Sequence, residues 1–292
     1  LPFVKDFQPK GTGESPLATH PSFYQVRCPK CGAKARRETD VSDTFLDSAW
    51  YFLRYPSANY HKAAWDPKIT REWLPVNTYI GGQEHAVLHL LYSRFVTMAF
   101  SDLKLLSFEE PFTKFRAHGL ITKDGAKMSK SKGNVVNPDE YFEAFGADAM
   151  RLYLAFLAPF EQGGDFRDEG ISGVTRFLDR AWRKSEQVIE NKSRKTSPAA
   201  LKFIHKAVKK VAEDIELLRY NTAISALMIS LNEIEGAEVS LKDWKIFIQL
   251  LAPFAPYMTE EMWSKVGEKK SIHRSSWPAY DKAHLEEALY SA

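Results

Sequence analysis

The segment that most constrains this chain is residues 127–134, which read Lys-Met-Ser-Lys-Ser-Lys-Gly-Asn. Three lysines, two serines and a glycine leave little apolar surface to bury, so this lysine loop is expected to be exposed and flexible. Lysine ammonium groups are movable point charges that can neutralise a triphosphate attacked at its α-phosphorus. The alternative is a solvated basic turn with no chemical role, which is the usual meaning of a Lys/Ser/Gly-rich run.

Short apolar runs alternate with helical patterns between residues 39 and 160. Strand, turn, helix and strand in that order are typical of a parallel nucleotide-binding sheet. The expected elements are a helix at 47–55, a strand at 76–80, a helix at 84–100 and a strand at 115–121, before the lysine loop. The sequence therefore predicts an α/β domain over this region.

A helical bundle is predicted after residue 160. Apolar residues recur at spacings of three and four from 201 to 234, and further helices are expected at 242–251 and 257–266, separated by Ala252-Pro253-Phe254-Ala255-Pro256. A chain of 292 residues with 44% hydrophobic residues can bury two cores. The expected division is a connecting segment at 1–38, an α/β domain at 39–160 and an all-α domain at 161–292.

The charge distribution is uneven, although the formal net charge of +3 is too small to imply nucleic-acid binding by itself. Between residues 180 and 210 there are ten lysines and arginines but only two acids. We expect a phosphate-contacting surface here, and a solvated helix face with a charged linker is the alternative. The candidate phosphate-contacting residues are Arg180, Arg183, Lys184, Lys206, Lys209 and Lys210.

No apolar run approaches the roughly 20 residues that a membrane-spanning helix needs. The start of the chain has no basic-then-apolar targeting pattern, so a cytoplasmic location with no membrane partner is expected.

Two cysteines, Cys28 and Cys31, stand in a Cys-Pro-Lys-Cys-Gly knuckle that aims two thiols at one metal ion. Structural zinc takes four ligands, and the chain has no second cysteine pair, although His20 is a candidate third ligand. Three readings stay open: a zinc site, a metal-free remnant of a zinc ribbon, and a disulfide, which a reducing compartment disfavours.

Two further segments decide the family that the chain resembles. Residues 79–95 read Tyr-Ile-Gly-Gly-Gln-Glu-His-Ala-Val-Leu-His-Leu-Leu-Tyr-Ser-Arg-Phe, and residues 43–55 read Asp-Thr-Phe-Leu-Asp-Ser-Ala-Trp-Tyr-Phe-Leu-Arg-Tyr. With the lysine loop, they closely resemble the leucyl-tRNA synthetases of class I. The isoleucine and valine enzymes usually carry leucine where Lys132 stands, so they are weaker matches. Residues 250–256 resemble the helical anticodon-binding domain that all three share.

The resemblance implies an ATP site. Independently of it, two glycines between a strand and a helix let the backbone approach a ligand. The expected ATP-binding residues are Gly81, Gly82, Glu84, His85, Gly119, Leu120, Ile121, Met128 and Ser129. The expected catalytic residues are Lys127, Lys130 and Lys132, with Lys130 the first choice for the transition-state contact. Asp148 and Arg151 are expected to support the site through salt bridges or helix caps.

The resemblance also implies an amino-acid pocket. His85 and His89 are four residues apart and would share one helical face, as would Phe45, Ser48 and Tyr51 at intervals of three. Ordinary core packing is the alternative for each of them. The residues that the resemblance assigns to the leucine pocket are Phe45, Ser48, Tyr51, Tyr79, His85 and His89.

The fold implied is the second half of a Rossmann-like catalytic domain followed by an α-helical bundle. The implied activity is ATP-dependent activation of leucine, with Mg²⁺ accompanying ATP, and transfer of leucine to tRNA. The early His-x-Gly-His element of class I enzymes is absent from the 292 residues. We therefore expect the isolated chain to be inactive and to need an N-terminal catalytic half as partner. A noncatalytic tRNA-binding subunit and an isoleucine or valine enzyme remain alternatives.

Overall fold

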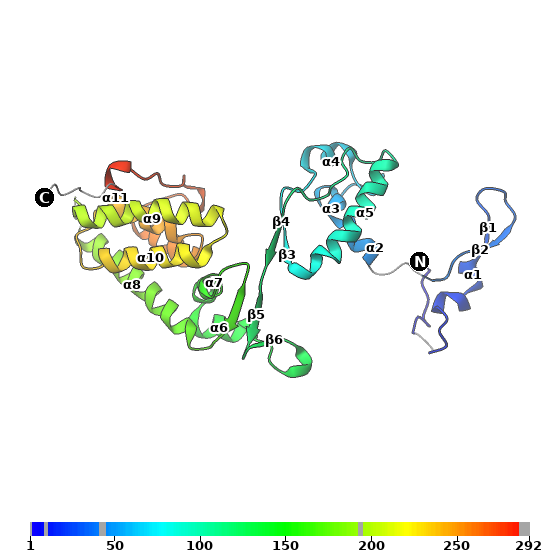
Figure 1. The fold of residues 1–292 in the computed structure, drawn as a ribbon, viewed down its shortest axis with the longest axis horizontal. Coiled ribbons are helices and arrows are strands. Elements are labelled where there is room, and N and C mark those ends of the chain that lie inside the picture. The colour runs from blue at the N-terminus through cyan, green and yellow to red at the C-terminus, as the bar shows by residue number, and fades with distance from the viewer. Residues whose placement is uncertain (1, 9–10, 41–44, 192–194, 286–292) are drawn as a thin grey trace. The chain divides into compact units, whose positions relative to one another are not determined.

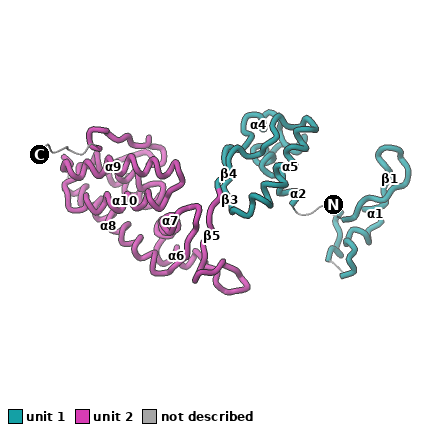
Figure 2. The backbone as a smooth tube through the Cα atoms, viewed as in Figure 1, with its two compact units in different colours: residues 1–116 teal, residues 117–292 magenta. Residues whose placement is uncertain are grey.

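The computed structural model describes residues 2–8, 11–40, 45–191 and 195–285. The chain divides into two compact units, Leu1–Arg116 and Ala117–Ala292, each with a hydrophobic core (Figure 2). Among the helices of the described residues, none has the length and apolar character needed to cross a membrane. The three-part domain division drawn from the sequence stays a prediction.

The first unit begins with a small hairpin that carries the cysteine knuckle. A 3₁₀ turn at Pro16–Thr19 and helix α1 (Pro21–Tyr24) lead into strands β1 (Gln25–Arg27) and β2 (Lys34–Arg36), which pair antiparallel. The turn between the strands closes through hydrogen bonds from the Cys28 amide to Ala33 and from the Gly32 amide to Cys28.

The rest of the first unit is built of short elements around a small aromatic core. The elements are α2 (Phe45–Ser48), α3 (Tyr51–Arg54), α4 (Pro67–Trp73), β3 (Tyr79–Gly82), α5 (His89–Asp102) and the start of β4 (Phe115–His118). The core holds Phe52, Leu53, Trp65 and Leu106. β3 pairs with β4, and the amide of Tyr79 donates to the carbonyl of Lys114.

Two predicted helices of this unit are wrong in extent. The helix expected at 47–55 is divided into α2 and α3 by a break at Ala49 and Trp50. The helix expected at 84–100 begins as a 3₁₀ turn, Gln83–Ala86, and becomes α-helical only at His89. His85 and His89 therefore do not belong to one continuous helix.

The second unit opens with a three-stranded sheet in the order β6-β5-β7, from Ala126–Lys127, Leu120–Lys123 and Gly163–Phe166. β5 runs parallel to β7, with Leu120 opposite Gly163 and Thr122 opposite Asp165. This parallel pairing agrees with the predicted fold class. The strand expected at 115–121 is divided into β4 and β5 at Gly119, whose amide donates to the carbonyl of Phe160.

β5 and β6 form a hairpin that the sequence analysis did not predict. Its two turn residues, Asp124 and Gly125, have φ angles of 54° and 70°. Both residues need this left-handed conformation in the tight turn that matches strand twist, and Asp-Gly is among its preferred sequences. The hairpin delivers the chain directly into the lysine loop.

Seven helices complete the described part of the second unit (Figure 1). They are α6 (Pro138–Phe145), α7 (Ala147–Phe156), α8 (Gly170–Asn191), α9 (Pro198–Glu216), α10 (Tyr220–Ile234), α11 (Leu241–Leu251) and α12 (Pro256–Lys265). The periodic stretch 201–234 is two helices, because Leu218 adopts a positive φ of 57° between them. Trp244, Phe247 and Leu227 are fully buried in the bundle core.

Asp148 and Arg151 hold the joint between α7 and α12, as expected from the sequence. The Asp148 carboxylate accepts from the amides of Tyr257 and Met258 at 3.3 and 2.6 Å, which caps the first turn of α12. The Arg151 guanidinium donates two hydrogen bonds to the Pro253 carbonyl, at 3.1 and 3.0 Å. The expected helix cap is therefore present at Asp148, whereas the support of the ATP site by Asp148 and Arg151 stays a prediction.

Candidate active site

His89 is the centre of an aromatic cluster in the first unit. Its side chain is buried, and the rings of Tyr51 and Tyr79 lie 5.7 and 5.4 Å away, centroid to centroid. The His85 ring meets it edge-on at 6.1 Å. On the remaining side, His89 Nδ1 is 3.2 Å from the Tyr92 hydroxyl.

α2 reaches the same cluster through Tyr92. The Phe45 ring stacks on the Tyr92 ring at 5.2 Å, and Ser48 Oγ is 3.3 Å from the Tyr92 hydroxyl. The structure thus gathers all six predicted pocket residues around His89 and Tyr92, and they come from α2, α3, β3, the 3₁₀ turn Gln83–Ala86 and α5. The sequence analysis missed Tyr92, whose signal was its position three residues after His89 on α5. Asp43 and Thr44 of the recognised segment lie outside the described residues.

Three side chains of the cluster, His89, Tyr51 and Tyr79, are uncharged near pH 7. Burial lowers the pKa of His89, and the neighbouring His85 lowers it further. Burial raises the pKa values of Tyr51 and Tyr79. Desolvation has these opposite directions because it disfavours the charged form of each group. A wall of uncharged rings suits an aliphatic ligand side chain better than a charged ligand side chain.

Two imidazole nitrogens in this cluster have no partner among the described residues. His85 Nδ1 and His89 Nε2 are both buried without a hydrogen bond. Buried polar atoms in native proteins are almost always paired, so unpaired ones mark places where a ligand or water completes the hydrogen bonding. This is the feature that separates the cluster from ordinary core packing.

The glycine turn beside this cluster has a more local role than the one expected. A Cβ on Gly82 would lie 2.4 Å from Glu84 Oε2, and a Cβ on Gly81 would lie 2.8 Å from the Tyr79 ring. Gly81 and Gly82 therefore make room for the side chains of Tyr79 and Glu84. Their direct contact with ATP stays a prediction.

In the second unit, the lysine loop is folded on itself by Asn134. The side-chain oxygen Oδ1 of Asn134 accepts a hydrogen bond from the Ser129 backbone amide at 2.9 Å. The side-chain nitrogen Nδ2 of Asn134 donates to the Lys127 carbonyl at 3.3 Å. A single 3₁₀ turn at Lys130–Lys132 ends at Gly133, which has a φ of 68°. Met128 packs against the core of the unit and anchors the start of the loop. The sequence analysis quoted Asn134 but assigned it no role.

The three lysines of the loop point away from this internal frame. Lys127, Lys130 and Lys132 are all exposed, and no acidic side chain of the described residues forms a salt bridge with them. Here the loop displays its ammonium groups unneutralised, which suits a polyanionic ligand.

β5 presents an open backbone edge beside the loop. Leu120 and Ile121 pair with Gly163 and Gly164 of β7, whereas β6 pairs only with the end of the strand, at Thr122 and Lys123. In the described part of the sheet, the other edge of Leu120 and Ile121 has no strand partner. An edge of this kind can hydrogen-bond to a flat heterocycle, which is compatible with the ATP-binding role predicted for Leu120 and Ile121.

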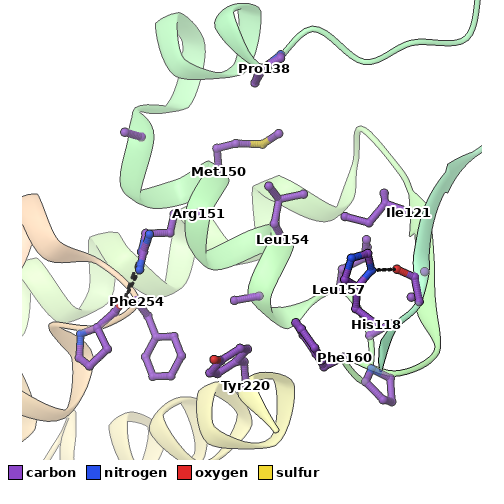
Figure 3. Close-up of a pocket in the computed structure, with 18 of the residues that line it drawn as sticks. His118, Ile121, Pro138, Met150, Arg151, Leu154, Leu157, Phe160, Tyr220 and Phe254 are labelled. Atoms are coloured by element: carbon purple, nitrogen blue, oxygen red, sulfur yellow. Dashed lines mark hydrogen bonds between the residues drawn. The ribbon is translucent and has the colours of Figure 1, made fainter. Parts of the chain in front are cut away.

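A cavity of ≈ 920 Å³ lies between β5, α7 and the bundle (Figure 3). Gly119 and Ile121 line it, and Leu154, Phe160 and Tyr220 make much of the remaining wall. Its one lining lysine or arginine is Arg151, whose guanidinium already donates to Pro253. The cavity is therefore mainly apolar, and it does not suit a triphosphate.

The predicted tRNA surface needs one correction. Lys184 is buried, 3% exposed, and its ammonium donates to the carbonyls of Glu235 and Ala237 at 3.0 and 2.8 Å. Burial lowers the pKa of this lysine. Lys184 caps the carbonyl end of α10, so its assignment as a tRNA contact was wrong.

Three other members of the basic segment form ion pairs, and one of these pairs joins Lys209 to Glu213 at 4.0 Å. Arg180 forms an ion pair with Glu235 at 2.6 Å, and Lys210 forms one with Asp214 at 2.6 Å. Arg183, Lys206 and Lys209 remain exposed on α8 and α9. The phosphate-contacting surface is therefore smaller than the count of basic residues suggested.

The cysteine knuckle does not assemble a closed zinc site. Cys28 and Cys31 are both free thiols, and hydrogen bonds from the Cys31 and Lys30 backbone lower the pKa of Cys28. His20 Nε2 lies 3.0 Å from Asp6 Oδ1 instead of joining the cysteines. Across the described residues, no three His, Cys, Asp or Glu side chains come together in an arrangement that could hold a metal ion. Two thiols alone do not fit tetrahedral zinc.

Comparison with known proteins gives this geometry a family. The model "tRNA synthetases class I (I, L, M and V)" matches residues 20–166, just over half of the chain. The chain belongs to the class I tRNA synthetases. A second model, "Anticodon-binding domain of tRNA ligase", matches residues 198–291 of this class I chain.

Curated relatives with high identity to the chain are leucine–tRNA ligases. The chain is 44% identical over 288 residues to the leucine–tRNA ligase of Dehalococcoides mccartyi and 45% identical over 308 residues to that of Thermotoga maritima. These alignments cover 95% and 98% of the chain but 35% and 37% of the relatives. The class I chain thus spans about a third of the length of the curated relatives that it matches.

Solved structures agree. The LeuRS of the Agrobacterium radiobacter K84 LeuRS–tRNA–LeuAMS ternary complex matches with a TM-score of 0.84 and 33% identity, over 93% of this chain and 37% of that one. Methionyl-tRNA synthetase of Mycobacterium tuberculosis, in complex with methionyl-adenylate, matches with a TM-score of 0.59 over 86% of this chain and 58% of that one. At 18% identity, the second match shows a shared fold alone.

Proposed function

We propose that this chain is the part of a leucine–tRNA ligase that carries the lysine loop. The observation that carries the proposal is the set of three exposed ammonium groups on a loop whose own side chains fix its shape. The leucine–tRNA ligase relatives, 44–45% identical, direct the proposal to leucine. The cytoplasmic location expected from the sequence stays a prediction.

In the proposed reaction, a carboxylate oxygen of leucine attacks the α-phosphorus of ATP, and pyrophosphate leaves. Negative charge then grows on the departing pyrophosphate oxygen, where Lys130 and its neighbours stabilise it. In the second step, a hydroxyl of the terminal tRNA ribose attacks the acyl carbon, and AMP leaves. The chain positions reactants and stabilises charge, and no covalent enzyme intermediate is needed. Mg²⁺ bound to ATP would add charge neutralisation without a dedicated protein cage.

The aromatic cluster around His89 is the proposed leucine pocket. Its neutral rings offer an apolar wall, and the unpaired nitrogens of His85 and His89 offer hydrogen bonds to the polar end of the ligand. Such a pocket separates side chains that differ by one methylene by only about 1–3 kcal/mol. Discrimination against valine is therefore expected to be limited in the first step.

A chimera tests the proposed activity. In the Thermotoga maritima leucine–tRNA ligase, the aligned segment is replaced by this chain, and ATP–pyrophosphate exchange is measured with each amino acid in turn. Leucine is expected to support exchange, with isoleucine and valine at least roughly tenfold slower in kcat/KM. Exchange that prefers isoleucine or valine, or none from a folded chimera that still binds tRNA, would overturn the leucine assignment.

The second candidate is a noncatalytic tRNA-binding module, favoured by the anticodon-binding match at 198–291. Both candidates predict tRNA binding that weakens with salt. Arg183→Ala and Lys206→Ala are each expected to lower the slope of log K against log salt by about one, because each removes one phosphate contact. Lys210→Ala is the matched control, since that ammonium is already paired with Asp214. Unchanged slopes in the first two variants would move the RNA surface elsewhere.

A further inference from the structure

Two carboxylates at the end of β7 hold the hairpin that leads into the lysine loop. Asp165 is the third residue of β7, and Asp168 lies two residues beyond the strand, before α8 begins at Gly170. The sequence analysis assigned neither of them a role. Both face segments that border the lysine loop in the chain.

Asp165 fixes the turn of the hairpin. One of its carboxylate oxygens accepts from the Thr122 hydroxyl at 2.8 Å and from the Gly125 amide at 2.8 Å. These two hydrogen bonds lower the pKa of Asp165, so it is ionised at neutral pH. The β5–β6 turn is therefore tied to β7 through side-chain bonds in addition to the sheet.

Asp168 connects the segment that enters the loop to the segment that leaves it. One oxygen pairs with the Lys123 ammonium at 2.8 Å, on the strand before the loop. The other oxygen accepts a short hydrogen bond from the Tyr141 hydroxyl, on α6 after the loop. The eight loop residues thus lie between two groups that bind the same carboxylate.

The surroundings keep this three-residue cluster in place. The Tyr141 ring packs edge-on against the buried Phe166 ring at 5.1 Å, centroid to centroid. The Lys123 ammonium lies over the Phe166 ring, 5.5 Å from its centroid. The hydrogen bonds from Lys123 and Tyr141 lower the pKa of Asp168, and the hydrogen bond to Asp168, with burial, raises the pKa of Tyr141 to about 12. The Asp168 carboxylate therefore stays charged and the Tyr141 hydroxyl stays protonated near neutral pH.

We propose that Asp168, with Lys123 and Tyr141, positions the lysine loop for its contact with the triphosphate. The part played by the loop rests on the proposed function, whereas the mechanical part stands on the geometry alone. Asp168 is a positioning residue because it reaches the reaction only through the loop.

Trypsin tests the mechanical part on the chain as it is, because the loop contains three lysines. Limited digestion of the native chain is followed by mass spectrometry of the first cuts. Asp168→Asn and Tyr141→Phe are expected to speed cleavage after Lys127, Lys130 and Lys132 by roughly tenfold, through more frequent local opening. Glu268→Gln, which removes a similar ion pair with Lys245 in the bundle, is expected to leave these cuts unchanged.

The proposal would be overturned if Asp168→Asn and Tyr141→Phe were both cleaved in the lysine loop at the wild-type rate. Faster cleavage throughout the chain in Asp168→Asn alone would indicate general unfolding of that variant. The cleavage rate of the lysine loop in Tyr141→Phe, which removes only a hydroxyl, then decides whether the proposal holds. In the chimera, Asp168→Asn is expected to lower kcat for exchange roughly tenfold while the KM for leucine stays unchanged. A raised leucine KM with normal kcat contradicts positioning. If the wild-type chimera has no leucine-dependent exchange, the proposed function fails, but the trypsin result still stands.

Discussion

Replacing Lys130 with alanine is expected to lower kcat for leucine-dependent pyrophosphate exchange by roughly 10²–10³-fold in the chimera. This is the usual loss when one preorganised charge or hydrogen-bond donor is removed from a transition state. Lys130 is exposed, it begins the single 3₁₀ turn of the loop, and no described acid neutralises it. The KM for leucine is expected to change little, because no leucine-pocket residue is altered.

Lys269→Ala is the matched control for Lys130→Ala, since Lys269 is an exposed lysine of the helical bundle. Its exchange rate is expected to equal that of the wild type. Lys130→Arg adds a further comparison, because it keeps the charge but replaces a point charge with a planar fork, and only partial recovery is expected. Equal rates for Lys130→Ala and Lys269→Ala would remove the lysine loop from the chemistry.

The largest effect on stability is expected from Gly163→Ala. Gly163 has a φ of 69°, and an added Cβ would lie 2.0 Å from the carbonyl oxygen of Leu120. The left-handed backbone alone costs about 1–2 kcal/mol for a residue with a side chain. The clash with a backbone atom of β5 adds to this, so the free energy of unfolding is expected to fall by more than about 3 kcal/mol in urea titrations.

Gly267→Ala separates these two contributions. Gly267 has a φ of 88°, but nothing lies within 4 Å of an added Cβ. Its substitution is expected to cost about 1–2 kcal/mol, from the backbone conformation alone. If Gly163→Ala and Gly267→Ala lower the free energy of unfolding by the same amount, the close contact between β5 and β7 does not constrain the sheet.

Local sequence patterns predicted the parts of this chain that depend on neighbouring residues. The lysine loop and the helices at 242–251 and 257–266 follow from short-range rules, whereas the single helical face expected for His85 and His89 does not form. The hairpin at Asp124 and Gly125 was missed although its turn signal was present. β7 was missed because Gly163 and Gly164 give a strand little intrinsic preference, and only the pairing with β5 makes it one.

Long-range pairing explains the errors at the basic surface. Ten lysines and arginines in a short segment suggested a strong positive patch, but Glu235 from α10 neutralises Arg180. The main-chain carbonyls after α10 take up Lys184 in the same region. Neither partner is adjacent in sequence to the residue that it binds, so counting charges along the chain overstated the surface. The aromatic cluster was predicted more fully, because the resemblance supplied its long-range contacts.

Asp168 lies in the short segment that joins β7 to the long helix α8. α8 begins two residues after this aspartate and continues without interruption for 22 residues, about 33 Å, along the bundle that the anticodon-binding match occupies in part. A helix of that length behaves as a stiff rod. In the proposed enzyme, an RNA contact on α8, such as that proposed for Arg183, would therefore be connected through this helix to Asp168 and the start of the lysine loop.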